Sequence, residues 1–238
     1  MTQQTRIQKF IALSGLCSRR KAEDLIKEGK VKVNDKLVTI GDTCLETDKI
    51  EVNGNVISFN LDDMVYIIIN KSSGYVTTNS DEFDRKTIFD FLSEKDRKDN
   101  LFSVGRLDKD TSGLLILTND GQFAQSVIHP SKKIAKEYIV KLDKELQEDD
   151  LEYLESGVVL DGYKLKPLEI RRIGTDKYAV VIYEGRKRQI RRMFEVLDYE
   201  VTNLHRIKIG GLDLKDLNIG FKEYKLVTKQ FLENKIFN

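Results

Sequence analysis

The chain has 238 residues, which suffices for one large domain or for a small domain and a medium one. Forty Lys and Arg against 39 Asp and Glu give a formal net charge of +1, so a nucleic-acid site would have to come from local clusters of basic residues. The two cysteines, Cys17 and Cys44, provide no disulfide framework and no metal-ligand spacing, and no run reaches the roughly 20 apolar residues of a membrane span. Because the N-terminus also has no apolar signal core, we expect a soluble cytoplasmic protein.

The first 60 residues are predicted to form a compact unit of two short helices followed by small strands. Apolar residues recur at helical spacing from Ile7 to Ile11, and Ser18 can cap a second helix that Gly29 ends. Asn53-Gly54, which follows a short β-favouring run, is a strong signal for a two-residue hairpin.

Basic residues gather at the two ends of the second predicted helix. Arg19, Arg20 and Lys21 fall in its first turn, and Lys30 lies just past its end. Cations at a helix N-terminus oppose the helix dipole, so an anionic ligand explains them better than stability does, with a merely solvated charged face as the alternative. The pattern over residues 6–34 resembles the S4 RNA-binding domain, and the resemblance implies that these four residues bind RNA.

A short polar hinge, Phe59 to Met64, is expected to divide the chain into domains 1–60 and 61–238. Strands outnumber helices in the second domain and occur in clusters and not in strict βαβ repeats. The sequence therefore predicts an α+β fold with a central mixed or largely antiparallel β-sheet. The expected strands are Val65–Ile69, Lys136–Leu142 and Tyr178–Tyr183, and the expected helices are Lys86–Leu92, Gln122–Ile128 and Glu145–Glu155.

One polar turn carries the most specific motif of the chain. Gly105-Arg106-Leu107-Asp108 leads into the apolar run Leu114–Leu117, which Asn119-Asp120-Gly121 closes. A loop held on a buried strand is a common place for chemistry, although most loop aspartates only form turns or caps. Residues 105–121 resemble the catalytic motif of the pseudouridine synthases in the family of RsuA, RluB, RluE and RluF. This resemblance implies that Asp108 is the indispensable catalytic residue.

A second motif, Glu184 to Met193, concentrates positive charge at the start of a predicted helix. The buried face of that helix is expected to hold Ile190, Met193, Phe194 and Leu197. Four cations are then expected on the polar side of its first two turns, namely Lys187, Arg188, Arg191 and Arg192. Because like charges at this spacing repel by roughly a few tenths of a kcal/mol per pair, folding does not favour the cluster, whereas an adjacent RNA backbone would offset the repulsion.

The family resemblance assigns roles to further residues around Asp108. Arg191 is implied to pair with Asp108 and keep it ionised, because an opposite charge offsets the desolvation that raises a carboxyl pKa. Tyr138 is implied to stack on the target base and to handle a proton, although a tyrosine on an alternating strand is usually plain core. Arg106 is implied to insert where the target nucleotide leaves its stack.

The other expected substrate-binding residues are Lys71, Arg188, Ile190 and Arg192. Lys71 belongs to a loop that matches the family's Lys-Pro-x-Gly pattern, except that Ser72 replaces the proline. This departure puts the rigidity of the loop in doubt.

The resemblance implies site-specific isomerisation of uridine to pseudouridine in ribosomal RNA. The base keeps all its atoms, so we expect no cofactor and no metal, and the nucleotide must flip out of its stack to be reached. The segment from Asp198 to Val201 looks more like the RluB and RluF branch, which favours 23S rRNA, with 16S rRNA as the alternative. The expected partner is ribosomal RNA or a large-subunit assembly intermediate, bound by a monomer.

A different class of protein is also compatible with the N-terminal pattern. The chain could be an S4-type RNA-binding ribosome-assembly factor with a catalytically silent second domain. The joint presence of Asp108, Tyr138 and Arg191 argues against this, since a binding protein has no need of all three. A tRNA-charging enzyme with an S4 tail is excluded because the chain has no nucleotide-binding motif.

Overall fold

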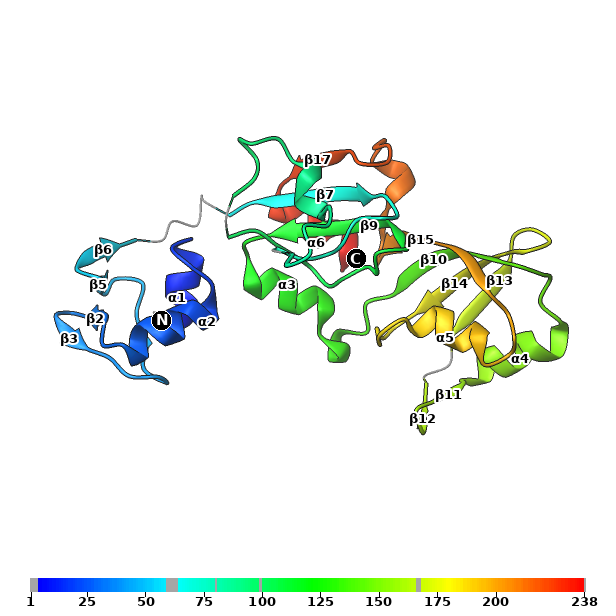
Figure 1. Cartoon of the computed structure of the whole chain (residues 1–238), viewed down its shortest axis with the longest axis horizontal. Helices are drawn as coiled ribbons and strands as arrows, with labels where there is room; N and C mark the ends of the chain where they lie inside the picture. The colour runs from blue at the N-terminus through cyan, green and yellow to red at the C-terminus, as the bar shows by residue number, and fades with distance from the viewer. Residues whose placement is uncertain (1–3, 59–63, 80, 99, 166–167, 238) are drawn as a thin grey trace. The chain divides into compact units, whose positions relative to one another are not determined.

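The computed structural model describes residues 4–58, 64–79, 81–98, 100–165 and 168–237 (Figure 1). The chain forms two compact units, one of Met1–Val65 with Glu94–Phe102 and one of Tyr66–Ser93 with Ser103–Asn238. The sequence-based division at residue 60 did not anticipate that Glu94–Phe102 groups with the first unit. The expected hinge falls on residues 59–63, which lie outside the described residues. Across the described ranges, no helix is long and apolar enough to cross a membrane.

The first unit packs two helices, α1 (Ile7–Leu13) and α2 (Arg19–Lys27), over a small apolar core. The Ser18 hydroxyl accepts a hydrogen bond from the Lys21 backbone N–H at 3.3 Å, which confirms the predicted start of α2. The Asn53-Gly54 turn has both residues at positive φ, as a two-residue hairpin requires. The strands of this unit are β1 (Thr5–Arg6), β2 (Val31–Val33), β3 (Lys36–Leu37), β4 (Thr43–Cys44), β5 (Ile50–Val52) and β6 (Asn55–Ile57), paired as β1-β4 and β3-β2-β5-β6.

The second unit is built on one mixed sheet with the strand order β13-β14-β10-β15-β9-β7-β17. Neighbouring strands in this order are antiparallel, except that β9 and β15 run parallel. Every residue of β7 and β9 is buried, so these two strands form the centre of the core. The predicted α+β fold with a central mixed sheet is therefore confirmed.

The strands of the second unit are β7 (Tyr66–Lys71), β9 (Ser112–Thr118), β10 (Lys136–Leu142), β13 (Glu169–Arg172), β14 (Lys177–Ile182), β15 (Val201–Ile209), β16 (Leu212–Asp213) and β17 (Tyr224–Val227). Two further strands, β11 (Val159–Leu160) and β12 (Tyr163–Lys164), form a separate hairpin, and β8 (Phe102–Ser103) lies where the chain passes from the first unit to the second.

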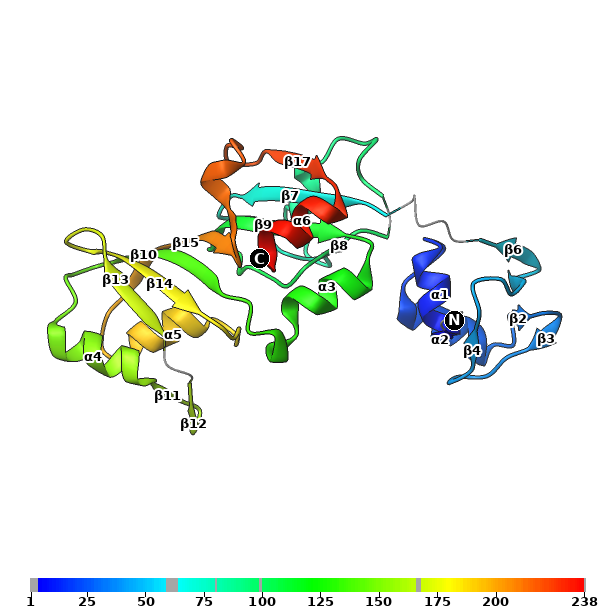
Figure 2. The ribbon, with the colours of Figure 1, turned by 180° about the vertical axis from the view of Figure 1, so that it is seen from behind.

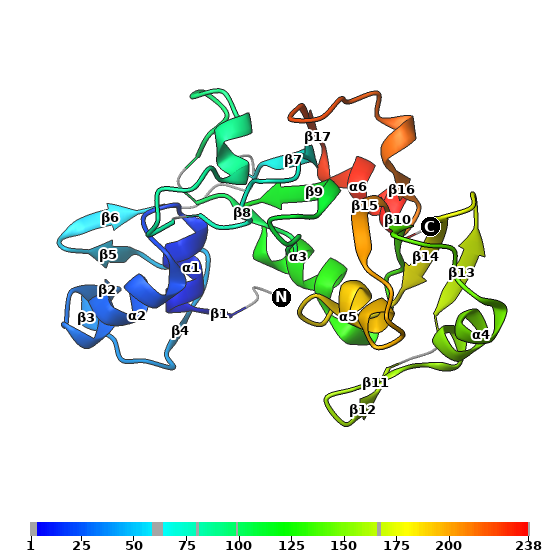
Figure 3. The same cartoon turned by 45° about the vertical axis from the view of Figure 1, so that its right-hand side comes forward.

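Helices flank this sheet: α3 (Gly121–Ile128), α4 (Glu148–Ser156), α5 (Gln189–Glu195) and α6 (Lys229–Ile236), with the 3-10 turns η2 (Ile88–Phe91), η3 (Pro130–Lys132) and η4 (Leu214–Asp216). The ring of Phe123 on α3 meets Tyr66 of β7 edge-on at 5.5 Å, which fixes α3 against the centre of the sheet. Opposite views show α6 lying along β7 and β9 (Figures 1 and 2). Figure 3 shows α4 beside β13 and α5 beside β15.

Two predicted helices differ from the structure. The segment expected as a helix from Lys86 to Leu92 forms only the 3-10 turn η2, because Thr87 and Asp90 cap each other's backbone and close a single turn. The helix around Ile190 begins at Gln189, so Lys187 and Arg188 do not lie on its first turns as expected. Arg188 has φ 50° and stands in the left-handed region just before the helix, so these two cations belong to a turn.

A close approach between β9 and β15 explains one glycine of the 105–121 motif. Gly113 lies opposite Arg206 in the parallel pairing and has φ +110°. A Cβ atom at residue 113 would lie 2.2 Å from the Arg206 carbonyl oxygen. This atom belongs to the backbone of a paired strand and cannot move aside as a flexible side chain could. Only glycine therefore lets β15 run this close to the strand that follows Asp108.

Candidate active site

Side-chain alternation on β10 and β15 separates two cavities of the second unit. Tyr138 and Arg206 line a cavity of about 780 Å³, whereas their chain neighbours Glu137 and His205 line another of about 890 Å³. Since adjacent strand residues point to opposite sides, the two cavities lie on opposite faces of the sheet. Of these two, the 780 Å³ cavity is the one that Asp108 lines, and we call it the Asp108 cavity.

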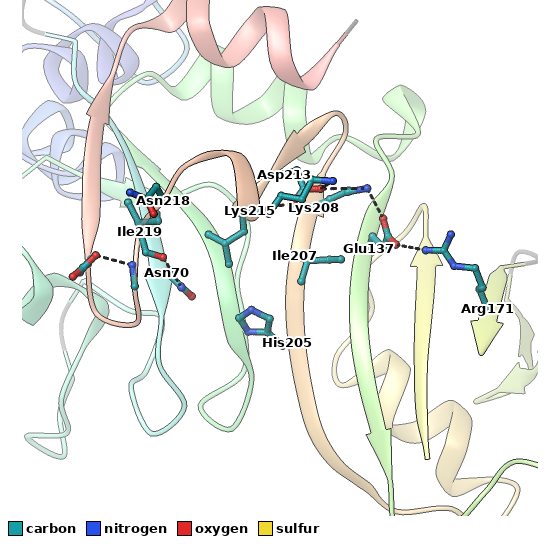
Figure 4. A pocket seen from close by; sticks show the side chains of 13 residues that line it. Asn70, Glu137, Arg171, His205, Ile207, Lys208, Asp213, Lys215, Asn218 and Ile219 are labelled. Atoms are coloured by element: carbon teal, nitrogen blue, oxygen red, sulfur yellow. Dashed lines mark hydrogen bonds and ion pairs between the residues drawn. The ribbon is translucent and has the colours of Figure 1, made fainter. Parts of the chain in front are cut away.

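The 890 Å³ cavity is larger but its charged side chains are largely paired with one another (Figure 4). Lys208 lies 3.2 Å from a Glu137 oxygen and 3.4 Å from an Asp213 oxygen. Arg171 also donates to Glu137. The charged groups of this cavity neutralise one another, and neither Asp108 nor Tyr138 lines it. It is therefore the weaker candidate for the active site, although it is larger.

Five of the expected site residues meet in the Asp108 cavity. They are Arg106, Asp108, Tyr138, Arg188 and Ile190. Arg106 is exposed, Asp108 is half-buried, and Tyr138 is 7% exposed and forms part of the wall. A catalytic carboxylate, a buried aromatic ring and exposed cations thus surround one space large enough for a nucleotide.

Lys71 holds the loop that carries Asp108. It is fully buried, and its ammonium donates to the backbone carbonyls of Asp108 (3.0 Å), Lys109 (3.3 Å) and Thr111 (2.5 Å), as well as to Ser72 (3.3 Å). Burial lowers the pKa of Lys71 to about 8, against the opposing charges of Asp110 and Asp108. Lys71 lines neither cavity and instead shapes the loop that carries Asp108, so its expected contact with substrate stays a prediction.

The loop with Ser72 in place of proline is nevertheless tied to the Asp108 loop. The Gly74 backbone N–H donates to the Lys109 carbonyl at 2.7 Å, and the Lys71 ammonium donates to the same carbonyl at 3.3 Å. Thr77 adds a hydrogen bond of 2.7 Å from its hydroxyl to the Leu107 carbonyl. These bonds fix the loop without the proline.

Arg191 does not contact Asp108, contrary to the expectation. Its guanidinium donates to the Val201 carbonyl at 2.6 Å and the Asp110 carbonyl at 3.0 Å, and its Nε lies 3.3 Å from an Asp110 carboxylate oxygen. Among the described residues, the Asp108 carboxylate makes no ion pair. Arg191 therefore pairs with Asp110, two residues beyond the expected partner.

Asp110 is the acidic residue that the cations of the second motif neutralise. Arg188 contacts both of its carboxylate oxygens, at 3.1 and 3.2 Å. Burial would raise the pKa of Asp110, but the Arg188 hydrogen bonds and the charges of Arg191 and Arg188 outweigh it and lower the pKa. Arg192 instead donates to Asp161 at 2.6 Å and lines neither cavity, so its expected substrate contact is not supported by the geometry.

Sequence reasoning missed Arg206, a buried cation in the wall of the Asp108 cavity. Arg206 is 3% exposed, its Nε donates to the Leu114 carbonyl at 2.8 Å, and one terminal nitrogen lies 3.4 Å from the Tyr138 hydroxyl. The other terminal nitrogen is buried without a hydrogen-bond partner. One sequence signal could have indicated this role. Arg206 is a single arginine in β15, where the other inward-facing residues near it, Leu204 and Ile209, are apolar.

The four expected RNA-binding residues of the first unit are all exposed. Arg19, Arg20 and Lys21 make no ion pair within the described part of the chain, whereas Lys30 pairs with Glu28 at 2.6 Å. Three unpaired cations on the first turn of α2 remain available for an anion.

Comparison with known proteins agrees with both units. The model of the RNA pseudouridylate synthase family matches residues 65–196, and that of the S4 domain matches residues 5–50. The chain is 42% identical over 222 residues to the ribosomal large subunit pseudouridine synthase B of Bacillus subtilis (strain 168), covering 90% of this chain and 89% of the relative. It is 36% identical over 216 residues to the dual-specificity RNA pseudouridine synthase RluF of Escherichia coli (strain K12), covering 90% and 73%.

A solved crystal structure of a pseudouridylate synthase has the same fold. It superposes with a TM-score of 0.69 at 31% sequence identity and covers 97% of this chain and 99% of that one. The chain therefore belongs to the RsuA, RluB and RluF family of RNA pseudouridine synthases with an S4 domain, and it is an isomerase.

Proposed function

We propose that this enzyme isomerises uridine to pseudouridine in ribosomal RNA, and specifically in the 23S rRNA of the large subunit. The observation that carries the proposal is the Asp108 cavity, where the motif aspartate, Tyr138 and several cations surround one space. The rRNA class is supported by the relative named as acting on the large ribosomal subunit, which aligns with 90% of this chain. Such a substrate would be met in the cytoplasm.

In the proposed reaction the N1–C1′ glycosidic bond breaks, the uracil turns, and a bond forms between C5 and C1′. The proton lost from C5 balances the proton gained at N1, so the product is an isomer and no other reactant is consumed. We propose that Asp108 acts on the sugar, either as a nucleophile at C1′ or as a base. Its carboxylate is half-buried in the cavity and carries no ion pair among the described residues, which supports this role.

Tyr138 and Arg206 form the wall against which the flipped base would rest. The Tyr138 ring provides a stacking surface, and the Arg206 guanidinium 3.4 Å from its hydroxyl limits how the ring can turn. Arg106 is exposed at the cavity, where it can occupy the gap that the flipped nucleotide leaves.

We further propose a division of labour between residues 1–60 and 61–238. The exposed, unpaired cations of α2 support phosphate contact by the first domain, and the cavity lies within the second. Because the lining residues of the cavity all come from the second unit of one chain, a monomer is sufficient for the chemistry.

The experiment that tests the function maps pseudouridines in 23S and 16S rRNA from cells with and without this protein. A pseudouridine in 23S rRNA that disappears with the protein is the expected result. If only a pseudouridine in 16S rRNA disappears, the substrate is 16S rRNA and not 23S rRNA. Release of tritium from RNA labelled at uracil C5 tests the activity itself, and purified protein that releases none would support a silent RNA-binding factor.

A further inference from the structure

Phe83 is the most exposed large apolar side chain of the second unit, with 75% of its surface open. It stands in a loop that is ordered around one carboxylate. Asp81 accepts hydrogen bonds from the backbone N–H groups of Phe83 (3.2 Å) and Arg85 (2.8 Å), and its own side chain is only 5% exposed. The exposure of Phe83 is therefore a property of a fixed turn.

Arg85 covers part of the Phe83 ring. Its guanidinium carbon lies 5.0 Å from the ring centroid, and Asp81 clamps the same guanidinium through Nε at 3.1 Å and a terminal nitrogen at 2.6 Å. A cation held over one face of a ring that stays three-quarters exposed leaves the opposite face open. The Asp81–Arg85–Phe83 arrangement is thus a supported, one-sided aromatic platform.

The platform borders a third cavity of about 400 Å³, which reaches the catalytic loop. Phe83 and Arg85 line it together with Arg106, Asp108 and Lys109. Arg106, Leu107 and Asp108 line the Asp108 cavity as well, so the catalytic loop forms the partition between the two spaces. A nucleic-acid strand that places one nucleotide in the Asp108 cavity has its next nucleotides within reach of the other side of this partition.

We propose that Phe83 stacks on a nucleobase adjacent to the target uridine, while Lys109 contacts a phosphate of the same strand. Every base offers a π-face, so the open face of Phe83 suits any neighbouring nucleotide. Arg85 neutralises Asp81, and Lys109 makes no ion pair among the described residues and is free to contact a phosphate, although Glu82 also lines the cavity. The inference rests on the proposed function, since it requires RNA to be the substrate. It assigns a second binding site, for a flanking nucleotide, to a loop outside the motif residues.

The test first uses the wild-type protein to identify its pseudouridine in rRNA. A short RNA around that uridine is then made with 2-aminopurine at each neighbouring position in turn. We compare Phe83→Leu, which keeps an apolar side chain without a ring, with Phe83→Trp, which restores stacking. Phe221→Leu is the matched control, because Phe221 is also 60% exposed but lies beside His205 on the opposite face of the sheet.

Phe83→Leu is expected to weaken RNA binding by roughly 5- to 50-fold while the single-turnover rate at saturating RNA stays unchanged. The quenching of one flanking 2-aminopurine should be lost in Phe83→Leu and retained in Phe83→Trp and Phe221→Leu. If Phe83→Leu binds and quenches like the wild type on an RNA that the wild type modifies, the inference alone is overturned. A wild-type protein that forms no pseudouridine would overturn the proposed function and this inference with it.

Discussion

The Arg206 guanidinium lies 3.4 Å from the Tyr138 hydroxyl, and the backbone of the same arginine packs on Gly113 of the catalytic motif. One strand residue therefore joins the loop that carries Asp108 to the aromatic wall of the cavity. Burying an arginine with one unsatisfied terminal nitrogen is costly, because a charged donor loses its water without a full set of partners. Such a cost is typical of functional sites and uncommon in plain core.

Arg206→Gln is expected to lower the single-turnover rate by roughly 10- to 100-fold, the effect of losing one charged hydrogen bond of about 1.5–3 kcal/mol. The Arg206→Gln/Tyr138→Phe double variant should lose less than the product of the two single losses, because both act on one contact. Arg171→Gln is the control, since Arg171 is exposed and faces the other cavity. If the rate losses of the two single variants multiply fully in the double variant, Arg206 does not act through Tyr138. If the loss in Arg206→Gln follows from a lower melting temperature, Arg206 has only a structural role.

Asp108→Asn is expected to abolish isomerisation while folding and RNA affinity stay nearly intact. The two side chains have the same shape, and within the described chain no ion pair depends on the Asp108 charge. The measurements are tritium release, thermal unfolding and RNA binding on one preparation. Measurable turnover by a well-folded Asp108→Asn protein would remove Asp108 from the catalytic role.

Much of the fold could be predicted because its signals are local. The Ser18 cap and the Asn53-Gly54 hairpin need only neighbouring residues to form, and both are present in the structure. The buried strands could be recognised in the sequence as continuous apolar runs, such as Leu114–Leu117. The 3-10 turn at Ile88–Phe91 was missed because a reciprocal cap closes it after one turn, which apolar spacing does not reveal.

The site was only partly predictable because its contacts depend on long-range register. Asp108 and Tyr138 were found through the resemblance to a known motif, and they share a cavity. The partner of Arg191 could not be foreseen, since Asp110 is 81 residues away in the chain and meets it only in the folded protein. Arg206 was missed because its place beside Tyr138 and the Asp108 loop depends on the pairing of β15 with β9 and β10, which are far apart in the sequence.

Arg191→Ala is expected to cost more activity than Arg192→Ala, although each removes one cation from the same helix. Arg191 is only 12% exposed and fixes Asp110 in the catalytic loop, whereas Arg192 is more open and its pair with Asp161 lies away from the cavity. An exposed ion pair of this kind is worth about 0–1 kcal/mol. The measurement is the single-turnover rate of each variant at saturating RNA. Equal losses in the two variants would mean that the contact of Arg191 with Asp110 does not support the catalytic loop.

The buried Lys71 predicts opposite effects of alkaline pH on stability and on activity. Its pKa is about 8 in the folded protein and 10.5 in the absence of burial, so between these values the unfolded chain binds more protons. The free energy of unfolding therefore rises with pH between about 8 and 10.5. Below pH 8 Lys71 is charged in both states, so the full cost of burying its charge lowers stability there. A neutral amine donates fewer hydrogen bonds to the loop carbonyls, so the single-turnover rate should fall above pH 8. Lys71→Arg, which stays charged, should lose this alkaline limb; if it keeps the limb, another group causes it.

Replacing Arg19, Arg20 and Lys21 by alanine should weaken RNA binding far more than it weakens chemistry at saturating substrate. These side chains are exposed and unpaired within the described residues, and they lie in a unit that contributes nothing to the lining of the Asp108 cavity. Each lost phosphate contact reduces the log–log salt slope of binding by roughly 0.7 to 0.9. The triple variant should therefore shift the slope by about two units, while the single-turnover rate of bound RNA barely changes. A triple variant that keeps its salt slope but loses that rate would mean that the first unit positions the catalytic cleft, because phosphate contacts alone cannot alter a rate measured at saturation.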